Sequence, residues 1–221
     1  MSVDLQPILD LVTPTLRRSA AALWQPDGLR ERYGRYLSEM HAVIKASVPL
    51  MELAFTRCTG RDPVSVRLRQ YLPAHIEEEL GHDDWLLDDM RVAGLDPEAE
   101  LLRAPSVQVV RLVGPQYYWI NHGHPVALLG YMAVLEGNSP SPGLAGLLAH
   151  RTGLPDKAFD TLRHHADADP GHSDDIFAVL AELELSAAQR AAVRASALHT
   201  AAALIDLFDH LTLEARSELR V

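Results

Sequence analysis

The chain has 221 residues, 48% of them hydrophobic and 23% charged, which is the composition of one globular domain spanning 1–221 and too polar for a membrane protein. The formal charge is −10, and the basic residues are scattered, so nucleic acid is not an expected partner. The first residues lack the basic and apolar regions of a signal peptide, and the lone Cys58 cannot form an internal disulfide. We therefore expect a cytoplasmic protein.

Long segments carry apolar residues at helical spacing, and no run alternates as a half-buried strand does, which predicts an all-α fold. Pro49, Pro73 and Pro170 are expected to kink or interrupt three of the helices. The last helix is amphipathic and rich in alanine, so it should cover the bundle or join a dimer interface. In chain order, helices are expected at about 4–24, 29–58, 63–93, 107–121, 125–137, 142–152, 155–183 and 186–216.

The segment 71–90, projected as one helix, places an apolar stripe toward the core. Glu79 falls inside this stripe, His75 and His82 lie on its edge, and Glu77 and Glu78 point elsewhere. A core-facing carboxylate is costly unless it is paired or bound to a cation, so Glu79 is a candidate metal ligand. Asp83 also falls in the stripe as an alternative or supporting ligand, whereas Asp88 and Asp89 are expected to be solvated. The stripe consists of Leu72, Ile76, Leu80, Leu86, Leu87 and Met90.

An uncharged run over 126–135 ends in Glu136 and then Gly137. A negative charge in the last turn opposes the helix dipole, so a neighbouring cation would explain Glu136. The alternative is a solvated glutamate at a frayed helix end, and this element alone does not decide between the two.

The segment 158–183 places three potential ligands among its apolar positions: His165, Asp169 and His172. His164 and three nearby aspartates project to the opposite side. The Asp169-Pro170-Gly171 stretch leaves a second interpretation open, in which one helix ends there and Asp169 caps the next.

Two acid-x-x-His pairs, Glu79 with His82 and Asp169 with His172, carry the metal hypothesis. On a continuous helix, this spacing presents a carboxylate and an imidazole to the same point, as in dinuclear sites of helical bundles. Mixed nitrogen and oxygen ligation suits two irons or manganese better than structural zinc, for which cysteines are lacking, and we expect iron before manganese. The predicted ligands are Glu79, His82, Glu136, His165, Asp169 and His172.

The order of Glu79-x-x-His82, Glu136-Gly137 and His165-x3-Asp169-x2-His172 resembles the haem-oxygenase-like di-iron oxidase and oxygenase superfamily, over about 30–185. The resemblance implies a bundle of about seven helices, often dimeric, so we expect a homodimer. It implies that Glu136 bridges two Fe²⁺ ions and that O2 is a co-substrate, with electrons from an external donor. It further implies oxidation of a small molecule in specialised metabolism. An amino acid or amine is the expected substrate, with N-oxygenation, carbon–carbon cleavage or oxidative decarboxylation as the reaction.

Two other functions are open. His41, near the apolar stripe of the first long helix, could bind haem in a haem-binding or haem-degrading protein. The haem interpretation leaves the six-residue ligand set unexplained. A non-catalytic iron-binding protein would use the same ligands without turnover. Cys58 has no evident base nearby, which argues against a catalytic thiol.

Overall fold

The computed structural model describes residues 5–218, except for the side chains of Asp169, Pro170 and 214–218. Within this range the chain is helical and contains no strand, so the all-α prediction is confirmed. The α-helices are α1 (Gln6–Leu23), α2 (Leu29–Ile44), α3 (Ser47–Arg57), α4 (Pro63–Glu79), α5 (His82–Ala93), α6 (Pro97–Leu102), α7 (Val107–His122), α8 (Leu128–Glu136), α9 (Leu144–Thr152), α10 (Asp160–Glu182) and α11 (Ala187–Glu218), with short 3₁₀ turns η1 (Pro125–Ala127) and η2 (Asp156–Phe159).

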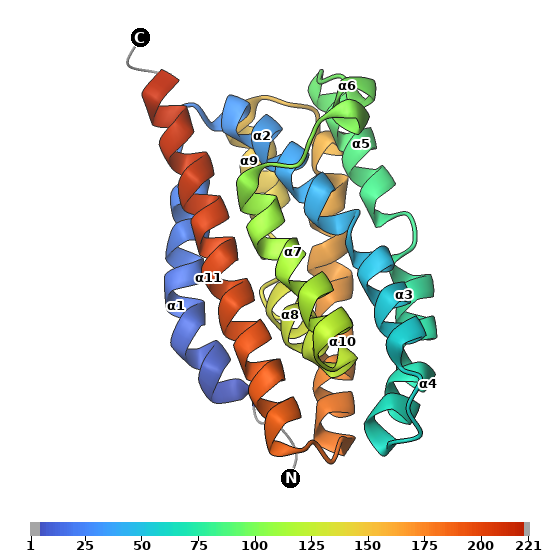
Figure 1. Cartoon of the computed structure of the whole chain (residues 1–221). Coiled ribbons are helices and arrows are strands. Elements are labelled where there is room, and N and C mark those ends of the chain that lie inside the picture. The colour runs from blue at the N-terminus through green and yellow to red at the C-terminus, as the bar shows by residue number, and fades with distance from the viewer. Residues whose placement is uncertain (1–4, 219–221) are drawn as a thin grey trace.

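The helices form one bundle in which α1 and α11 run side by side along one flank and α3, α4 and α5 form the other (Figure 1). The short, apolar α8 lies between them and packs against α11 and α10. All the residues of α8 from Leu128 to Val134 are buried, which explains why this segment shows no polar face. The bundle therefore places the end of α8, and Glu136 with it, in the interior.

The close approach of α8 and α11 depends on Gly130. A Cβ atom at this position would lie 2.2 Å from the carbonyl oxygen of Val193 and 2.9 Å from the backbone nitrogen of Ala197. Only a residue without a side chain lets the two helices meet at this distance. Gly130 thus fixes the depth at which α8 sits in the bundle.

Two long predicted helices are each divided in the structure. The segment 29–58 breaks into α2 and α3, with Pro49 in the first turn of α3. The segment 63–93 breaks at Leu80 and Gly81, where Gly81 adopts a left-handed conformation with φ of 84°. The projection of 71–90 as one helix was therefore wrong beyond Glu79. Leu80, assigned to the core stripe, is 60% exposed because the chain turns there.

Neither Pro73 nor Pro170 ends its helix. Pro73 lies inside α4, and α10 runs through Pro170 without a break. The interpretation in which Asp169 caps a new helix was wrong. The continuous helix keeps His165 and His172 two turns apart on one face of α10.

The segment Ala187–Leu213 of α11 is long and apolar enough to cross a membrane by length and composition. In the structure this helix packs against α1, α7 and α8, and half of its most apolar window is buried. A helix that covers a protein core satisfies the same criteria. The position of α11 agrees with its predicted role of covering the bundle.

Candidate metal centre

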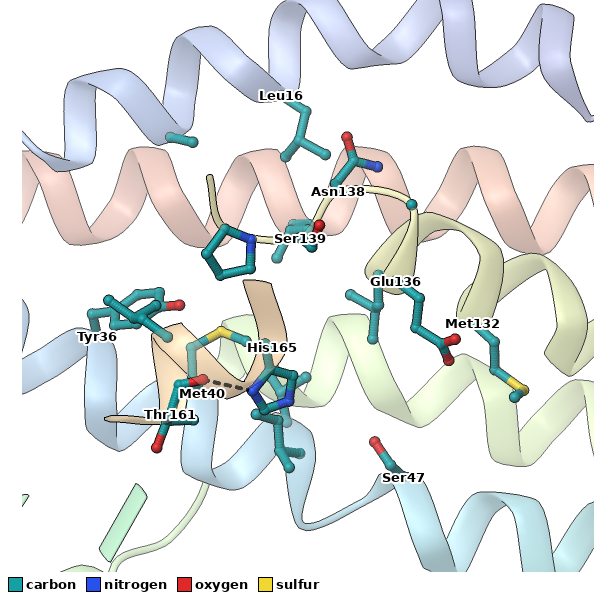
Figure 2. Close-up of a pocket in the computed structure, with 18 of the residues that line it drawn as sticks. Leu16, Tyr36, Met40, Ser47, Met132, Glu136, Asn138, Ser139, Thr161 and His165 are labelled. Atoms are coloured by element: carbon teal, nitrogen blue, oxygen red, sulfur yellow. Dashed lines mark hydrogen bonds between the residues drawn. The ribbon is translucent and has the colours of Figure 1, made fainter. Parts of the chain in front are cut away.

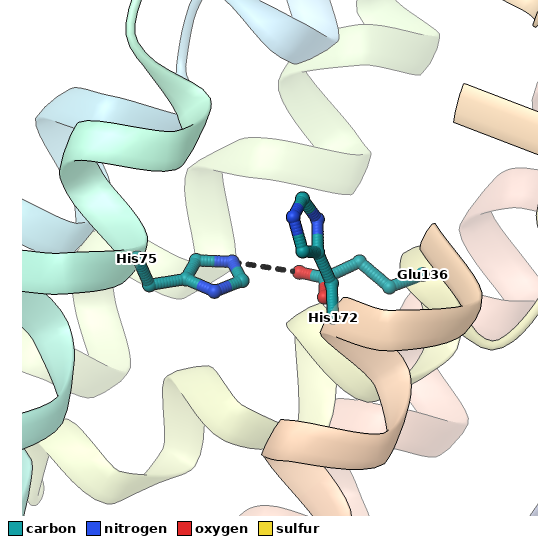
Figure 3. A group of neighbouring side chains, drawn as sticks. All are labelled: His75, Glu136 and His172. Atoms are coloured by element: carbon teal, nitrogen blue, oxygen red, sulfur yellow. Dashed lines mark hydrogen bonds and ion pairs between the residues drawn. The ribbon is translucent and has the colours of Figure 1, made fainter. Parts of the chain in front are cut away.

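Three side chains from three helices meet in the interior of the bundle. His75 comes from α4, Glu136 from the end of α8 and His172 from α10 (Figure 3). One ligand atom from each lies within 4.8 Å of the others. The Nε2 atom of His75 is 3.1 Å from Oε1 of Glu136, and the rings of His75 and His172 are 5.1 Å apart at their centroids. This group has the spacing and the donor types of a metal site.

A second group lies beside the first and consists of Glu79, His82 and His165. Oε2 of Glu79 is 3.3 Å from Nδ1 of His82, and the rings of His82 and His165 are 5.3 Å apart. The other oxygen of Glu79 reaches toward the first group, because Oε1 is 3.5 Å from Nδ1 of His172. Glu79 therefore lies between the two groups and contacts a histidine of each.

Several buried atoms of these groups have no hydrogen-bond partner in the structure: Nδ1 of His82, Nδ1 of His172 and Oε2 of Glu136. Buried polar atoms are almost always satisfied in folded proteins, so a cluster of unsatisfied ones indicates a missing ligand. All three are atoms that coordinate transition metals, and imidazole with carboxylate suits iron. The residues present thus fit a metal centre.

The environment changes the protonation of the buried groups. Burial raises the pKa of Glu136, because the effect of burial is larger than the opposite effect of His75. Burial acts to lower the pKa of His75, but the hydrogen bond and charge of Glu136, together with the charges of Glu79 and Glu78, outweigh burial, and the pKa is raised. For Glu79, the effect of burial is outweighed by His82, His165 and His75 together, and the pKa of the carboxyl is lowered. A cation shared among them would stabilise carboxylates and histidines that lie this close together.

Neighbouring groups orient three of the imidazoles. His165 donates from Nδ1 to the carbonyl oxygen of Thr161 at 2.9 Å, which leaves Nε2 as its metal-binding atom. The hydroxyl of Tyr71 lies 3.1 Å from Nδ1 of His75, so Nε2 of that ring faces Glu136. The indole of Trp85 stacks on His82 at 4.0 Å. These contacts fix ring orientation before any metal binds.

The start of α10 is held by a residue of another helix. Asp89 on α5 accepts hydrogen bonds from the backbone nitrogens of Asp160 at 3.2 Å and Thr161 at 3.1 Å. The helix has no capping side chain of its own. Asp89 is 1% exposed, and burial raises its pKa to about 6. The expectation that Asp89 is solvated was wrong. Asp89 is buried and anchors the helix that carries His165.

Five of the six predicted ligands, Glu79, His82, Glu136, His165 and His172, come together in the structure. The side chain of Asp169 lies outside the described side chains, so its predicted role stays a prediction. Glu136 is mostly buried, with 13% of its side chain exposed, and is not a solvated glutamate at a frayed end.

Sequence reasoning left His75 without a role, although it lies seven residues before His82. Glu78 was expected to point away, yet its Oε2 is 3.5 Å from Nδ1 of His75 and 3.7 Å from Nε2 of His172. No described contact joins Asp83 to the centre. The structure therefore adds His75 as a candidate ligand and places Glu78 at the edge of the site.

No described contact joins His41 to the metal centre. It is buried, and its Nδ1 atom is 3.8 Å from Oε1 of Glu100. Its neighbour Met40 lines the cavity beside the metal centre, but His41 does not. A haem ligand would need to face a cavity large enough for the macrocycle, so the structure does not support this alternative.

A cavity of about 630 Å³ opens beside the metal centre, within the usual range for small-molecule sites. Figure 2 shows Glu136 and His165 pointing into it, with Tyr36 and Met40 on one side and Leu16 of α1 opposite. The segment 137–142 lines another part of the wall. The metal centre is thus open to a space that can hold an organic molecule.

The sequence matches the model of a protein family described as iron-containing redox enzymes over residues 34–205. The chain belongs to this family. No curated protein matches the sequence. The family assignment confirms the resemblance noted from the motifs, and it indicates iron as the metal and redox chemistry as the activity class.

Solved structures confirm the haem-oxygenase-like fold of this iron-containing redox enzyme family member. A domain of unknown function with that fold from Shewanella denitrificans OS217 is 18% identical, with a TM-score of 0.81 over 97% of this chain and 94% of the other. A TenA homolog from Pseudomonas syringae pv. tomato DC3000 is 16% identical, with a TM-score of 0.71 over 96% and 94%. A CADD-like protein of unknown function from Nostoc punctiforme PCC 73102 is 17% identical, with a TM-score of 0.61 over 95% and 96%.

Proposed function

We propose that the protein is a non-haem di-iron oxidase or oxygenase that uses O2 to oxidise a small organic molecule. One observation carries the proposal: Glu79 faces His82 with one oxygen, at 3.3 Å, and His172 with the other, at 3.5 Å. A carboxylate in this position can bridge two cations, each completed by one of the two groups, so we assign the bridge to Glu79, whereas the resemblance implied Glu136. A site for a single ion would not need a second histidine-rich group beside it.

The first group, His75, Glu136 and His172, would hold one iron, and Glu79, His82 and His165 would hold the other. When bound, two ferrous ions supply electrons to O2 and thereby make an oxidant for the substrate. Further reducing equivalents come from an external donor, because no flavin or nicotinamide motif occurs in the sequence.

The chain's own residues position the metal ligands and exclude water from the centre. Tyr71 and the carbonyl of Thr161 orient His75 and His165, so the metal ligands are fixed in advance. Burial of the centre keeps bulk water from the reacting atoms. The cavity beside Glu136 and His165 holds the substrate within reach of the irons.

Oxygen uptake tests the proposal. Protein loaded anaerobically with Fe²⁺ is mixed with O2, a reductant and a panel of candidate substrates, and oxygen consumption and products are followed. We expect oxygen consumption that depends on iron and is accelerated by one substrate class. Glu79→Ala should abolish it, whereas Glu77→Ala, an exposed neighbour, should leave it unchanged. Iron binding with no oxygen-dependent product under any condition would favour an iron carrier instead.

A further inference from the structure

A row of aromatic rings leads from the candidate metal centre toward the protein surface. Trp85 on α5 stacks on His82, with ring centroids 4.0 Å apart and an angle of 26° between the two planes. The same indole lies 4.5 Å from the ring of His164 on α10 and 6.1 Å from the ring of His165. Trp85 therefore contacts one candidate ligand directly and lies near a second.

The three rings in contact differ in exposure. His82 is 5% exposed, Trp85 is half-buried and His164 is exposed. The contacts therefore form a continuous path from a buried candidate ligand to solvent. Neither Trp85 nor His164 lines the cavity beside the metal centre. The path thus reaches the centre by a different way from the space that would hold an organic molecule.

The middle ring of this path is of the kind that can carry an electron. An indole is among the most easily oxidised side chains, and an electron passes readily between rings that are in contact. An alternative role for Trp85 is to hold His82 in place by packing alone. A phenylalanine ring would fulfil that packing role almost equally well, but it is much harder to oxidise. The two roles can therefore be separated by substitution.

The surface at the outer end of the path is acidic. Asp84 precedes the indole in sequence, and Asp167 lies one turn after His164 on α10; both are exposed. The arginines on these parts of the two helices, Arg91 and Arg163, are each paired with an aspartate. Negative charge is therefore in excess here, which favours the approach of a positively charged partner.

We propose that Trp85 carries electrons into the metal centre, one at a time, from a donor protein whose positively charged face docks over His164. This inference rests on the proposed function and names the entry point of the external electrons. In each transfer the donor loses one electron, a ferric ion gains it and becomes ferrous, and no bond of the indole forms or breaks. Two transfers supply the electrons needed when one oxygen atom of O2 enters the substrate and the other leaves as water with two protons from solvent.

Anaerobic reduction of the ferric protein tests the inference without turnover. The donor is reduced hexaammineruthenium, a cation that an apolar cavity excludes, and the loss of ferric absorbance is followed by stopped flow. Trp85→Phe should slow the reduction by at least about tenfold, because its ring is not a ready electron carrier. Its affinity for Fe²⁺ should stay within about twofold of wild type, because a ring still packs on His82.

Trp119→Phe is the matched control for this substitution. Trp119 is also half-buried and also lies against a histidine, His199, but it is on α7 and outside the two candidate groups. Trp119→Phe should be reduced at the wild-type rate.

A spectroscopic signature separates electron transfer from packing. Ferrous protein is mixed with O2 in the absence of any donor, and samples are frozen for EPR spectroscopy. The oxidised centre then takes an electron from the nearest indole. Wild type and Trp119→Phe should show a transient indole radical, and Trp85→Phe should show none.

The charge of the docking surface is tested with the same ruthenium donor. The reduction rate should fall as salt is added, because salt screens exposed charges. Replacing Asp84 and Asp167 together by asparagine should lower the rate severalfold at low salt. The control removes two exposed charges elsewhere, with Asp10→Asn on α1 and Glu52→Gln on α3, and should change the rate little.

Three results would overturn the inference: equal reduction rates for wild type and Trp85→Phe, an indole radical that persists in Trp85→Phe, or equal effects of the two double substitutions. A loss of iron affinity in Trp85→Phe as large as its loss of rate would also overturn it, since packing alone would then explain Trp85. Failure of the wild-type protein to bind iron or to react with O2 counts against the di-iron proposal. Normal iron binding with a reduction rate independent of Trp85 counts against this inference alone.

Discussion

The Nε2 atom of His75 lies 3.1 Å from Oε1 of Glu136, although the two residues are 61 positions apart in sequence. Because α4 and the end of α8 meet at this contact, a histidine left without a role by the sequence becomes part of the metal centre. The same contact explains why Glu136 can stand in the last turn of α8, where its charge opposes the helix dipole.

Replacement of His75 should weaken one of the two iron sites. We expect His75→Gln to lower the affinity for one of the two irons by at least about tenfold while the second is retained. Titration with Fe²⁺ under anaerobic conditions measures both events. His164→Gln is the control, because His164 is exposed and contacts Trp85 outside the two groups. Unchanged titration in His75→Gln would remove this residue from the ligand set.

Gly130 should tolerate no side chain. Gly130→Ala places a methyl group against the Val193 carbonyl, and we expect it to lower the free energy of unfolding by about 1–3 kcal/mol. Gly146→Ala is the matched control, because no atom lies within 4 Å of a Cβ there and alanine favours the helix. Urea denaturation should show opposite signs for the two variants. A neutral Gly130→Ala would mean that α8 and α11 do not pack this closely.

The cap that α5 provides to α10 should contribute to stability. Asp89→Ala leaves the backbone nitrogens of Asp160 and Thr161 without an acceptor, which should cost about 1–2 kcal/mol. Asp89→Asn keeps one acceptor oxygen and should cost less. The neighbouring Asp88 is exposed, so Asp88→Ala should change the denaturation midpoint little. Equal effects of the alanine substitutions at 88 and 89 would argue against the cap.

His41 should make the fold sensitive to acid. Burial lowers the pKa of His41, with Glu100 opposing in part, so the unfolded chain binds a proton more readily than the folded one. The contribution of His41 to stability is therefore fully present above pH about 6.5 and is lost as the pH falls below it. Denaturation curves between neutral and mildly acidic pH should show a smaller loss for His41→Gln than for wild type. The exposed His150→Gln controls for removing a histidine elsewhere, and parallel curves for wild type and His41→Gln would refute the effect.

Helical periodicity was sufficient to predict the fold class and to gather most of the candidate site. It separated His165 and His172 from their acidic neighbours on α10, because residues a few positions apart on one continuous helix keep their relative directions. It also selected Glu79 from three consecutive glutamates.

The remaining features depend on tertiary structure. The turn at Gly81 separates Glu79 from His82, so this pair meets across a break between helices and not on one helical face, as the spacing had suggested. Asp89 appeared to be one of two surface aspartates, since nothing local indicates that α10 begins beside it. Arg17 lies about 120 residues from Glu136 in sequence, and only the packing of α1 reveals that both line one cavity.

The central claim is that these residues hold two irons that share Glu79. Iron analysis with Mössbauer spectroscopy on anaerobically loaded protein tests it most directly. Our account predicts close to two non-haem irons per chain, magnetically coupled after oxidation, with the coupling lost in Glu79→Ala. A single iron per chain, uncoupled irons, or uptake of haem in place of non-haem iron would contradict it.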